Sequence, residues 1–167
     1  GIAAAMEVDE EKTRCGRYAY CWPRDAAFIC RALDIIGMKE EVDKFYNVFC
    51  KKTQSKNGVW EQRFYTDGRL APCWGYQIDE TASVVHGVYE HYKIVKDIKF
   101  LKDTLKMCEK AISFLKKYVE DVISGENKFH ISYDLWEMNE GVHLYSLASI
   151  ISAFEAYIKI DEEVFST

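Results

Sequence analysis

The apolar and polar residues along the chain predict two kinds of helix that alternate in order. Three segments carry apolar residues around most of the helix circumference, as buried helices do: residues 22–36, 79–96 and 142–160. Two segments carry one apolar stripe opposite a charged face, as helices in an outer layer do: residues 39–52 and 100–122. This alternation predicts an all-α fold in which one layer of helices lies inside another.

The order of these segments fits two architectures. An αα-barrel or toroid of helical hairpins gives this alternation, and so does a solenoid of helical hairpins. No fixed period of about 30–50 residues recurs along the chain, which counts against the repeat scaffolds. After the second predicted helix, the turn signals Asn57-Gly58 and Asp67-Gly68 predict a small hairpin or an extended loop.

All four tryptophans of the chain lie within five residues of a carboxylate. Trp22, Trp74 and Trp136 stand at or before the starts of the three predicted buried helices, and in a barrel those starts meet at one mouth. Aromatic faces pack on the apolar faces of a sugar ring, so this arrangement predicts a sugar pocket. The fourth tryptophan, Trp60, is better interpreted as a packing residue.

The polar residues near these tryptophans are the candidates for binding and chemistry. We expect four of them to bind sugar hydroxyls in a fixed geometry: Arg24, Asp25, Gln77 and Asp79. Loss of water contact beside an aromatic ring disfavours the charged form of a carboxyl group, as a general acid requires. Glu137 directly follows Trp136 and is the candidate general acid for glycoside cleavage. Both Asp25 and Glu137 also suit a simple helix-start role, because acids there complement the helix dipole.

Composition and charge exclude several classes of function. The net charge of −5 and the shortness of the basic runs argue against a nucleic-acid surface. No signal peptide or membrane-spanning run is visible, so we expect a cytoplasmic protein without a membrane partner.

Neither a metal nor a cofactor is expected, because the cysteines lack the spacing of a zinc or redox motif and the histidines lack i, i+4 pairs. Two cysteines on apolar helix positions, Cys30 and Cys108, should be buried. The residues considered are Cys15, Cys21, Cys30, Cys50, Cys73 and Cys108, and His86, His91, His130 and His143.

Three segments together resemble glycoside hydrolase family 15, the glucoamylases and their bacterial glucodextranase- and trehalase-like relatives. They are residues 17–26, which include Trp22-Pro23-Arg24-Asp25, residues 74–80, and residues 134–137; residues 141–146 continue the bacterial form of the last motif. The family folds as an (α/α)6 barrel and cleaves α-glucosidic bonds from a non-reducing end with inversion. The resemblance implies the same fold and reaction for this chain.

The resemblance also implies a role for each matched residue. Arg24 and Asp25 resemble the pair that grips the hydroxyls of the terminal glucose. Trp74 and Trp136 resemble the aromatic walls of the site. Glu137 matches the family's general acid.

The chain departs from the family in two respects. Many members follow the acid with a second glutamate, whereas this chain has Met138, which affects recognition beyond the first sugar. Inversion also needs a second carboxylate, about 6.5–9.5 Å from the acid, to activate water. In the family that base lies in the second half of the barrel. We therefore expect residues 1–167 to form a single partial domain, the first half of a glucoamylase-like domain, that does not turn over alone.

The expected partners are an α-glucan or glucosyl oligosaccharide, and a second copy that associates through the open edge of the barrel. Two other functions stay open. The chain suits a non-catalytic sugar-binding or regulatory module, since the phosphorylase kinase regulatory subunits are similar to this family. It also suits a helical scaffold whose tryptophans are core residues only.

Overall fold

The structure is a computed structural model that describes residues 1–6, 18–125 and 132–166. The polar segment 7–17, which includes Cys15, and residue His130 lie outside the described residues. Helices make up most of the described chain, so the predicted all-α class is confirmed. None of the described helices combines the length and apolar composition that a lipid bilayer requires.

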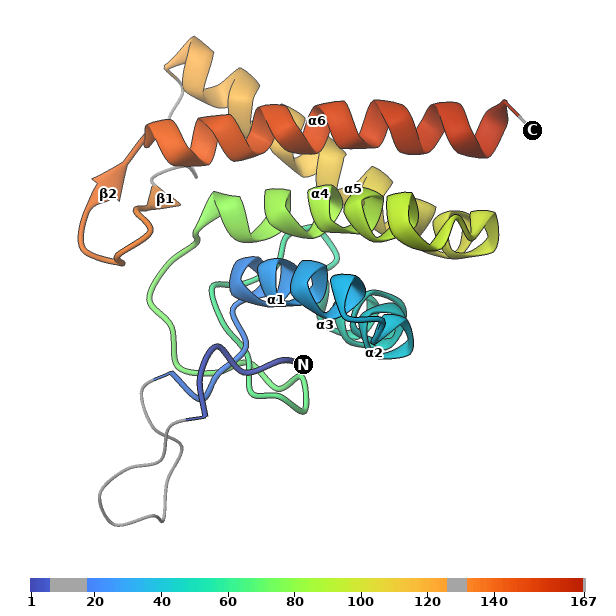
Figure 1. Cartoon of the computed structure of the whole chain (residues 1–167). Coiled ribbons are helices and arrows are strands. Elements are labelled where there is room, and N and C mark those ends of the chain that lie inside the picture. The colour runs from blue at the N-terminus through green and yellow to red at the C-terminus, as the bar shows by residue number, and fades with distance from the viewer. Residues whose placement is uncertain (7–17, 126–131, 167) are drawn as a thin grey trace.

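Three helices form an inner row. Helix α4 (Ile78–Val95) lies between α1 (Pro23–Ile35) and α6 (Leu144–Phe165) and contacts both along its length. All three run in the same direction, so their N-terminal ends lie at the same end of the molecule (Figure 1). The structure thus brings together the three helix starts that the sequence predicted to meet.

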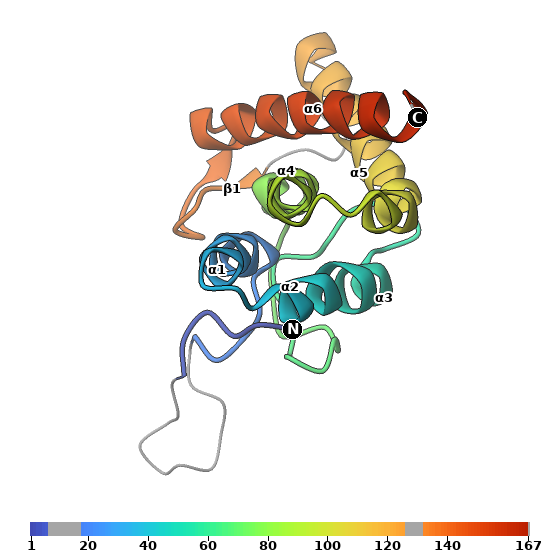
Figure 2. The ribbon, with the colours of Figure 1, turned by 45° about the vertical axis from the view of Figure 1, so that its right-hand side comes forward.

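Two further helical stretches form the second layer (Figure 2). Segments α2 (Lys39–Lys44), η1 (Phe45–Cys50) and α3 (Lys51–Thr53) continue one another as a single helix with a π-helical middle. This is the predicted helix 39–52, and its predicted stripe is buried: Val42, Phe45, Tyr46 and Phe49. Helix α5 (Ile98–Ser124) packs on α4 and α6 and is amphipathic as predicted.

A two-stranded hairpin precedes α6, just before the predicted helix 142–160. Strand β1 (Ser132–Tyr133) pairs antiparallel with β2 (Glu140–Gly141), in the register Ser132 to Gly141. The carboxylate of Asp134 accepts hydrogen bonds from the backbone N–H of Met138 at 2.9 Å and from the side chain of Asn139 at 2.7 Å. These bonds close residues 134–139 into a hairpin loop, and α6 (Leu144–Phe165) begins two residues after its predicted start at residue 142.

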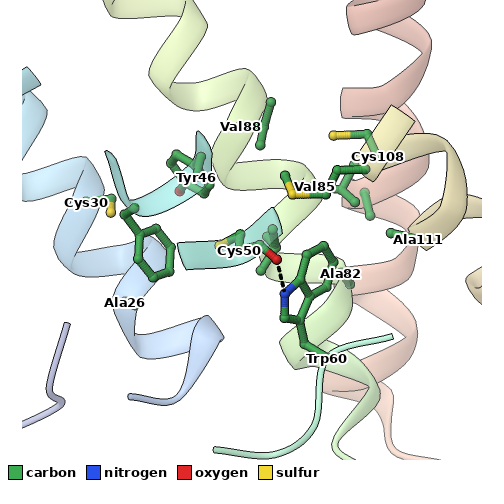
Figure 3. Packing of buried hydrophobic residues seen from close by; sticks show 14 of the residues in the cluster. Ala26, Cys30, Tyr46, Cys50, Trp60, Ala82, Val85, Val88, Cys108 and Ala111 are labelled. Carbon is green, nitrogen blue, oxygen red and sulfur yellow. Dashed lines mark hydrogen bonds between the residues drawn. The ribbon is translucent and has the colours of Figure 1, made fainter. Parts of the chain in front are cut away.

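The segment between α3 and α4 is extended, as the turn signals predicted. Phe64 forms isolated β-bridges to Cys21 and to Leu70. Gly68, with a φ of 90°, lies in the turn between Phe64 and Leu70. Trp60 is fully buried, and its indole N–H donates to the carbonyl of Cys50 at 3.0 Å (Figure 3). Its interpretation as a packing residue is therefore confirmed.

The core lies between the two layers, around α4. Figure 3 shows Cys30 and Cys108 among the buried side chains of this core, as the sequence predicted. Helix α4 is buried on nearly every side. The prediction that α1 and α6 are buried all round is wrong: Phe28 and Ile35 of α1 are 64% and 74% exposed, and Ile151 of α6 is 59% exposed. The physical reason is that α4 has a neighbour on either side, whereas α1 and α6 stand at the ends of the row.

Candidate functional site

A cavity of about 740 Å³ lies at the end of the molecule where the three inner helices begin. Its wall is largely aromatic, with two arginines and two carboxylates among the aromatic rings. Its lining residues are Ala4, Tyr18, Tyr20, Trp22, Arg24, Asp25, Phe28, Arg63, Trp74, Leu135, Trp136, Glu137 and Tyr145. Five of the seven predicted site residues are in this lining.

Arg24, in the first turn of α1, is the charged centre of the inner wall. One guanidinium nitrogen, Nη1, lies 2.6 Å from Asp79 and 3.0 Å from Glu80, and the other, Nη2, lies 3.1 Å from Asp25. Burial alone would lower the pKa of Arg24, but Glu80 and Asp79 outweigh burial and raise it. Burial raises the pKa of Glu80 well above its ordinary value, although Arg24 opposes this shift.

Gln77 and Asp79 do not line the cavity. Both are fully buried behind Arg24, although we predicted that they bind sugar directly. Gln77 accepts from the Arg24 guanidinium at 3.5 Å, and its amide N–H donates to the carbonyl of Asp134 at 2.6 Å. It thus links the arginine to the hairpin loop 134–139. In this structure, Gln77 and Asp79 both contact Arg24, and Gln77 also contacts the hairpin. The sequence motif that contains Gln77 and Asp79 does not show whether these side chains contact Arg24 or bind the sugar directly.

Glu137 stands in the hairpin loop 134–139 and is part of the cavity lining. Its backbone N–H donates to the carbonyl of Asp134 at 2.9 Å, which closes a tight turn. Its φ is 60°, in the left-handed region, where this kind of hairpin turn favours glycine. Its carboxylate accepts a hydrogen bond from the indole N–H of Trp22 at 2.9 Å and lies 3.4 Å from a guanidinium nitrogen of Arg63.

Trp74 and Trp136 both line the cavity, on its rim. The two residues are 55% and 79% exposed, so part of each side chain is accessible to a ligand. The aromatic side chain that contacts the Glu137 carboxylate is Trp22, which is 5% exposed, and not the adjacent Trp136 that the sequence had suggested.

Sequence reasoning missed Arg63. Its guanidinium lies 4.7 Å from the ring centre of Trp74, 5.3 Å from Trp22 and 5.6 Å from Tyr20, in addition to its contact with Glu137. The sequence gives little signal for Arg63, because the alternation of buried Trp60, Gln62 and Phe64 with the less buried residues 61, 63 and 65 is a feature of the structure. This period of two is that of an extended chain, and it places residue 63 on the side opposite the core.

The same face of this extended segment carries Glu61. Burial raises the pKa of the Glu61 carboxyl, and a hydrogen bond with Tyr76 opposes that rise. Glu61 is not in the cavity lining. Within the described residues, no three histidine, cysteine or acidic side chains gather in a way that could hold a metal ion.

Comparison with known proteins gives one similarity. No protein-family model matches the chain, and no solved structure matches it. The chain is 28% identical over 164 residues to an uncharacterized glycosyl hydrolase of Methanocaldococcus jannaschii. The aligned residues cover 98% of this chain and 24% of that protein, so the chain spans about a quarter of the length of the curated relative it matches.

Proposed function

We propose that this chain is part of the catalytic domain of a glycoside hydrolase and that Glu137 is its general acid. The observation that carries the proposal is the placement of Glu137. Non-glycine residues persist in left-handed backbone conformations where the surrounding structure fixes them, and such residues cluster at functional sites. Here the strained turn holds a carboxyl group inside an aromatic cavity, in contact with Trp22 and Arg63. The similarity to a protein named as a glycosyl hydrolase supports the same class of reaction.

The finer assignment is inverting hydrolysis of α-glucosidic bonds from a non-reducing end. It rests on the resemblance of three segments to the glucoamylase family. The parallel inner helices α1, α4 and α6 with an outer layer support a partial (α/α)6 barrel, because such a barrel has an inner ring of parallel helices. In this assignment Asp25, oriented by Arg24, binds hydroxyls of the terminal sugar, and Trp74 and Trp136 form the walls.

A second candidate is a non-catalytic sugar-binding module. The observation that favours it is the small number of carboxylates in the cavity lining. Among the described lining residues these are Asp25 and Glu137. Asp25 already bonds to Arg24. The described lining therefore offers no carboxylate free to activate water, as inversion requires.

Sugar binding tests the part that both candidates share. We expect maltose to bind in the range of about 1 mM, which corresponds to about −4 kcal/mol, because a partial site makes few contacts. Ligand-detected NMR should show this binding, and Asp25→Ala should abolish it. The matched control is Asp161→Ala, at an exposed position on α6 away from the cavity lining. Equal binding by wild type and Asp25→Ala would remove Asp25 from the site.

Turnover tests the acid. Residues 1–167 should hydrolyse maltose no faster than buffer, because the described part of the cavity lining offers no second carboxylate free to act as the base. In a polypeptide that contains the whole barrel, Glu137→Gln should keep sugar binding and lower turnover by about 10²–10⁴-fold, the usual effect of a positioned acid. An activated aryl leaving group should recover part of that loss. Robust hydrolysis by residues 1–167 alone would contradict the partial-site assignment. Unchanged turnover of Glu137→Gln would contradict the role of Glu137.

A further inference from the structure

We infer that Glu80 is a positioning residue of the proposed sugar site, which acts through Arg24 on Asp25. Glu80 is fully buried and does not line the cavity, so it touches no ligand there. It contacts Arg24 at two places, and Arg24 in turn contacts Asp25. The inference rests on the proposed function, because it assigns Glu80 a role in the sugar binding of Asp25.

The first contact is a helix cap supplied by a neighbouring helix. The first turn of a helix leaves backbone N–H groups without partners inside the helix, and a side chain at the N-cap commonly accepts from one of them. The N-cap residue of α1 is Trp22, which makes no such bond, and Pro23 has no N–H. The backbone N–H of Arg24 instead donates to Oε2 of Glu80 at 2.6 Å. Glu80 lies in the first turn of α4.

The second contact fixes the side chain. Glu80 Oε1 forms an ion pair with Nη1 of Arg24 at 3.0 Å, without the geometry of a hydrogen bond, so one carboxylate contacts both the backbone and the guanidinium of the same residue. In this orientation of Arg24, the second guanidinium nitrogen, Nη2, lies 3.1 Å from Asp25. The Arg24 side chain is 9% exposed and that of Asp25 is 41% exposed. Asp25 is therefore the most exposed member of this chain of contacts and the one most accessible to a sugar.

Asp79 has a different position in the cluster. It binds the same guanidinium nitrogen as Glu80, at 2.6 Å, but only Glu80 among the described contacts also binds the Arg24 backbone. Three carboxylates thus share one guanidinium. A glutamine at position 80 has one oxygen and cannot contact both the backbone N–H and the guanidinium of Arg24 as Glu80 does. Arg24 is then free to turn toward Asp79, and this movement would withdraw Nη2 from Asp25.

The test replaces Glu80 with glutamine and follows Arg24 directly. A guanidinium held by carboxylates rotates slowly and gives separate Nη signals in NMR, so we expect separate Arg24 signals in wild type and averaged signals in Glu80→Gln. Maltose affinity should fall by at least about tenfold, as expected for the loss of a charge-assisted contact. Glu80→Asp keeps the charge but is one methylene shorter and cannot reach both ends of Arg24. It should show the same loss and serves where Glu80→Gln does not fold.

The matched control is Glu90→Gln. Glu90 also joins α4 to α1, through a 2.7 Å ion pair with Arg31. A general role in fastening the two helices would make both glutamine variants behave alike. Our inference requires that Glu90→Gln leaves the Arg24 signals and the maltose affinity unchanged.

The outcomes separate this inference from the proposed function. Unchanged Arg24 signals, or unchanged maltose affinity, in Glu80→Gln would overturn the positioning role. An equal effect of Glu90→Gln would also overturn it. No maltose binding by wild type would overturn the proposed function and the sugar role of Glu80 with it, while the NMR signals would still report whether Glu80 holds Arg24.

Discussion

Two non-glycine residues of the described chain have a positive φ, and they have different explanations. Lys96, with a φ of 54°, ends helix α4, and left-handed residues are common at helix ends. Glu137, with a φ of 60°, occupies a turn position where glycine would be free of strain. The proposed role of Glu137 as the general acid would account for a carboxyl side chain at this unfavourable backbone position.

This strain gives a prediction at the scale of a single residue. Glu137→Gly and Glu137→Ala both remove the bonds to Trp22 and Arg63, but only glycine relieves the left-handed conformation. We therefore expect the glycine variant to unfold with a free energy about 1–2 kcal/mol higher than the alanine variant. Urea unfolding of the two variants measures this difference. A more stable alanine variant would show that the turn carries no strain.

Sequence reasoning located most of the individual site residues but not their contacts. The spacing of tryptophans and acids indicated five of the residues that line the cavity. It could not distinguish a residue that faces the ligand from one that supports it, because Gln77 and Asp79 share a motif with Trp74. Arg63 was missed because an isolated arginine in an extended segment resembles any solvated residue until its burial pattern is considered.

At the scale of elements, Gly87 sets how closely α4 approaches its neighbours. A Cβ at this position would collide with the hydroxyl of Tyr46 and would lie 3.3 Å from the Cβ of Ala27. In an exposed helix, changing glycine to alanine stabilises by about 1 kcal/mol. Here we expect Gly87→Ala to destabilise by about 1–3 kcal/mol, because overpacking forces the helices apart.

Thermal or urea unfolding measures this change, and Tyr46→Phe supplies its control. The phenylalanine ring lacks the hydroxyl that collides with the new methyl group. Gly87→Ala should therefore be less harmful in the Tyr46→Phe background than in wild type. Equal losses in the two backgrounds would show that the close approach of Tyr46 is not the cause.

The contact between α4 and α6 should depend on pH through His86. Burial lowers the pKa of His86, Lys93 and Arg31 lower it further, and Glu90 opposes them. The neutral ring bonds to Ser152 at 2.9 Å. Because the unfolded chain binds this proton more tightly, the stability contribution of His86 is complete above its ordinary pKa, and it is lost as the pH falls from that value through the lowered pKa of the folded state.

We therefore expect the unfolding temperature to fall more in wild type than in His86→Gln between about pH 7.5 and about pH 5.5. Glutamine can still bond to Ser152 but does not titrate. Other titrating groups affect both proteins equally, so the difference between the two isolates His86. Parallel pH dependence in the two proteins would contradict this prediction.

Element boundaries were predictable where the apolar period was long and failed where side chains bond locally. Helix α4 began within one residue of its predicted start. The hairpin before α6 was missed. The carboxylate of Asp134 makes bonds that close this hairpin, and such bonds cannot be predicted from the spacing of apolar residues. The π-helical middle of the second helix was missed for a similar reason, since it leaves the apolar stripe intact.

At the scale of the whole molecule, the inner row has two uncovered edges. On α6, four large apolar residues recur every seven positions and are all more than half exposed: Leu144, Ile151, Ile158 and Phe165. On α1, three residues form a shorter exposed surface: Phe28, Ile35 and Ile36. Apolar residues at a seven-residue interval are typical of a helix that packs along another helix. The sequence predicted apolar inner helices, but which of their faces lack a neighbour follows only from the arrangement in space.

We expect these two edges to cover each other between two copies of the chain. A two-fold axis parallel to the inner helices would place α1 of one copy beside α6 of the other, twice, and each edge would gain a parallel neighbour as α4 already has. Exposed apolar surfaces of this kind drive association. Wild type should therefore sediment as a dimer in the micromolar range, and Ile151→Glu should shift it toward monomer. Ile123 of α5 is 80% exposed but lies on neither edge, so Ile123→Glu should leave the dimer intact. A compact wild-type monomer, or equal effects of the two substitutions, would show that these edges do not associate in this way.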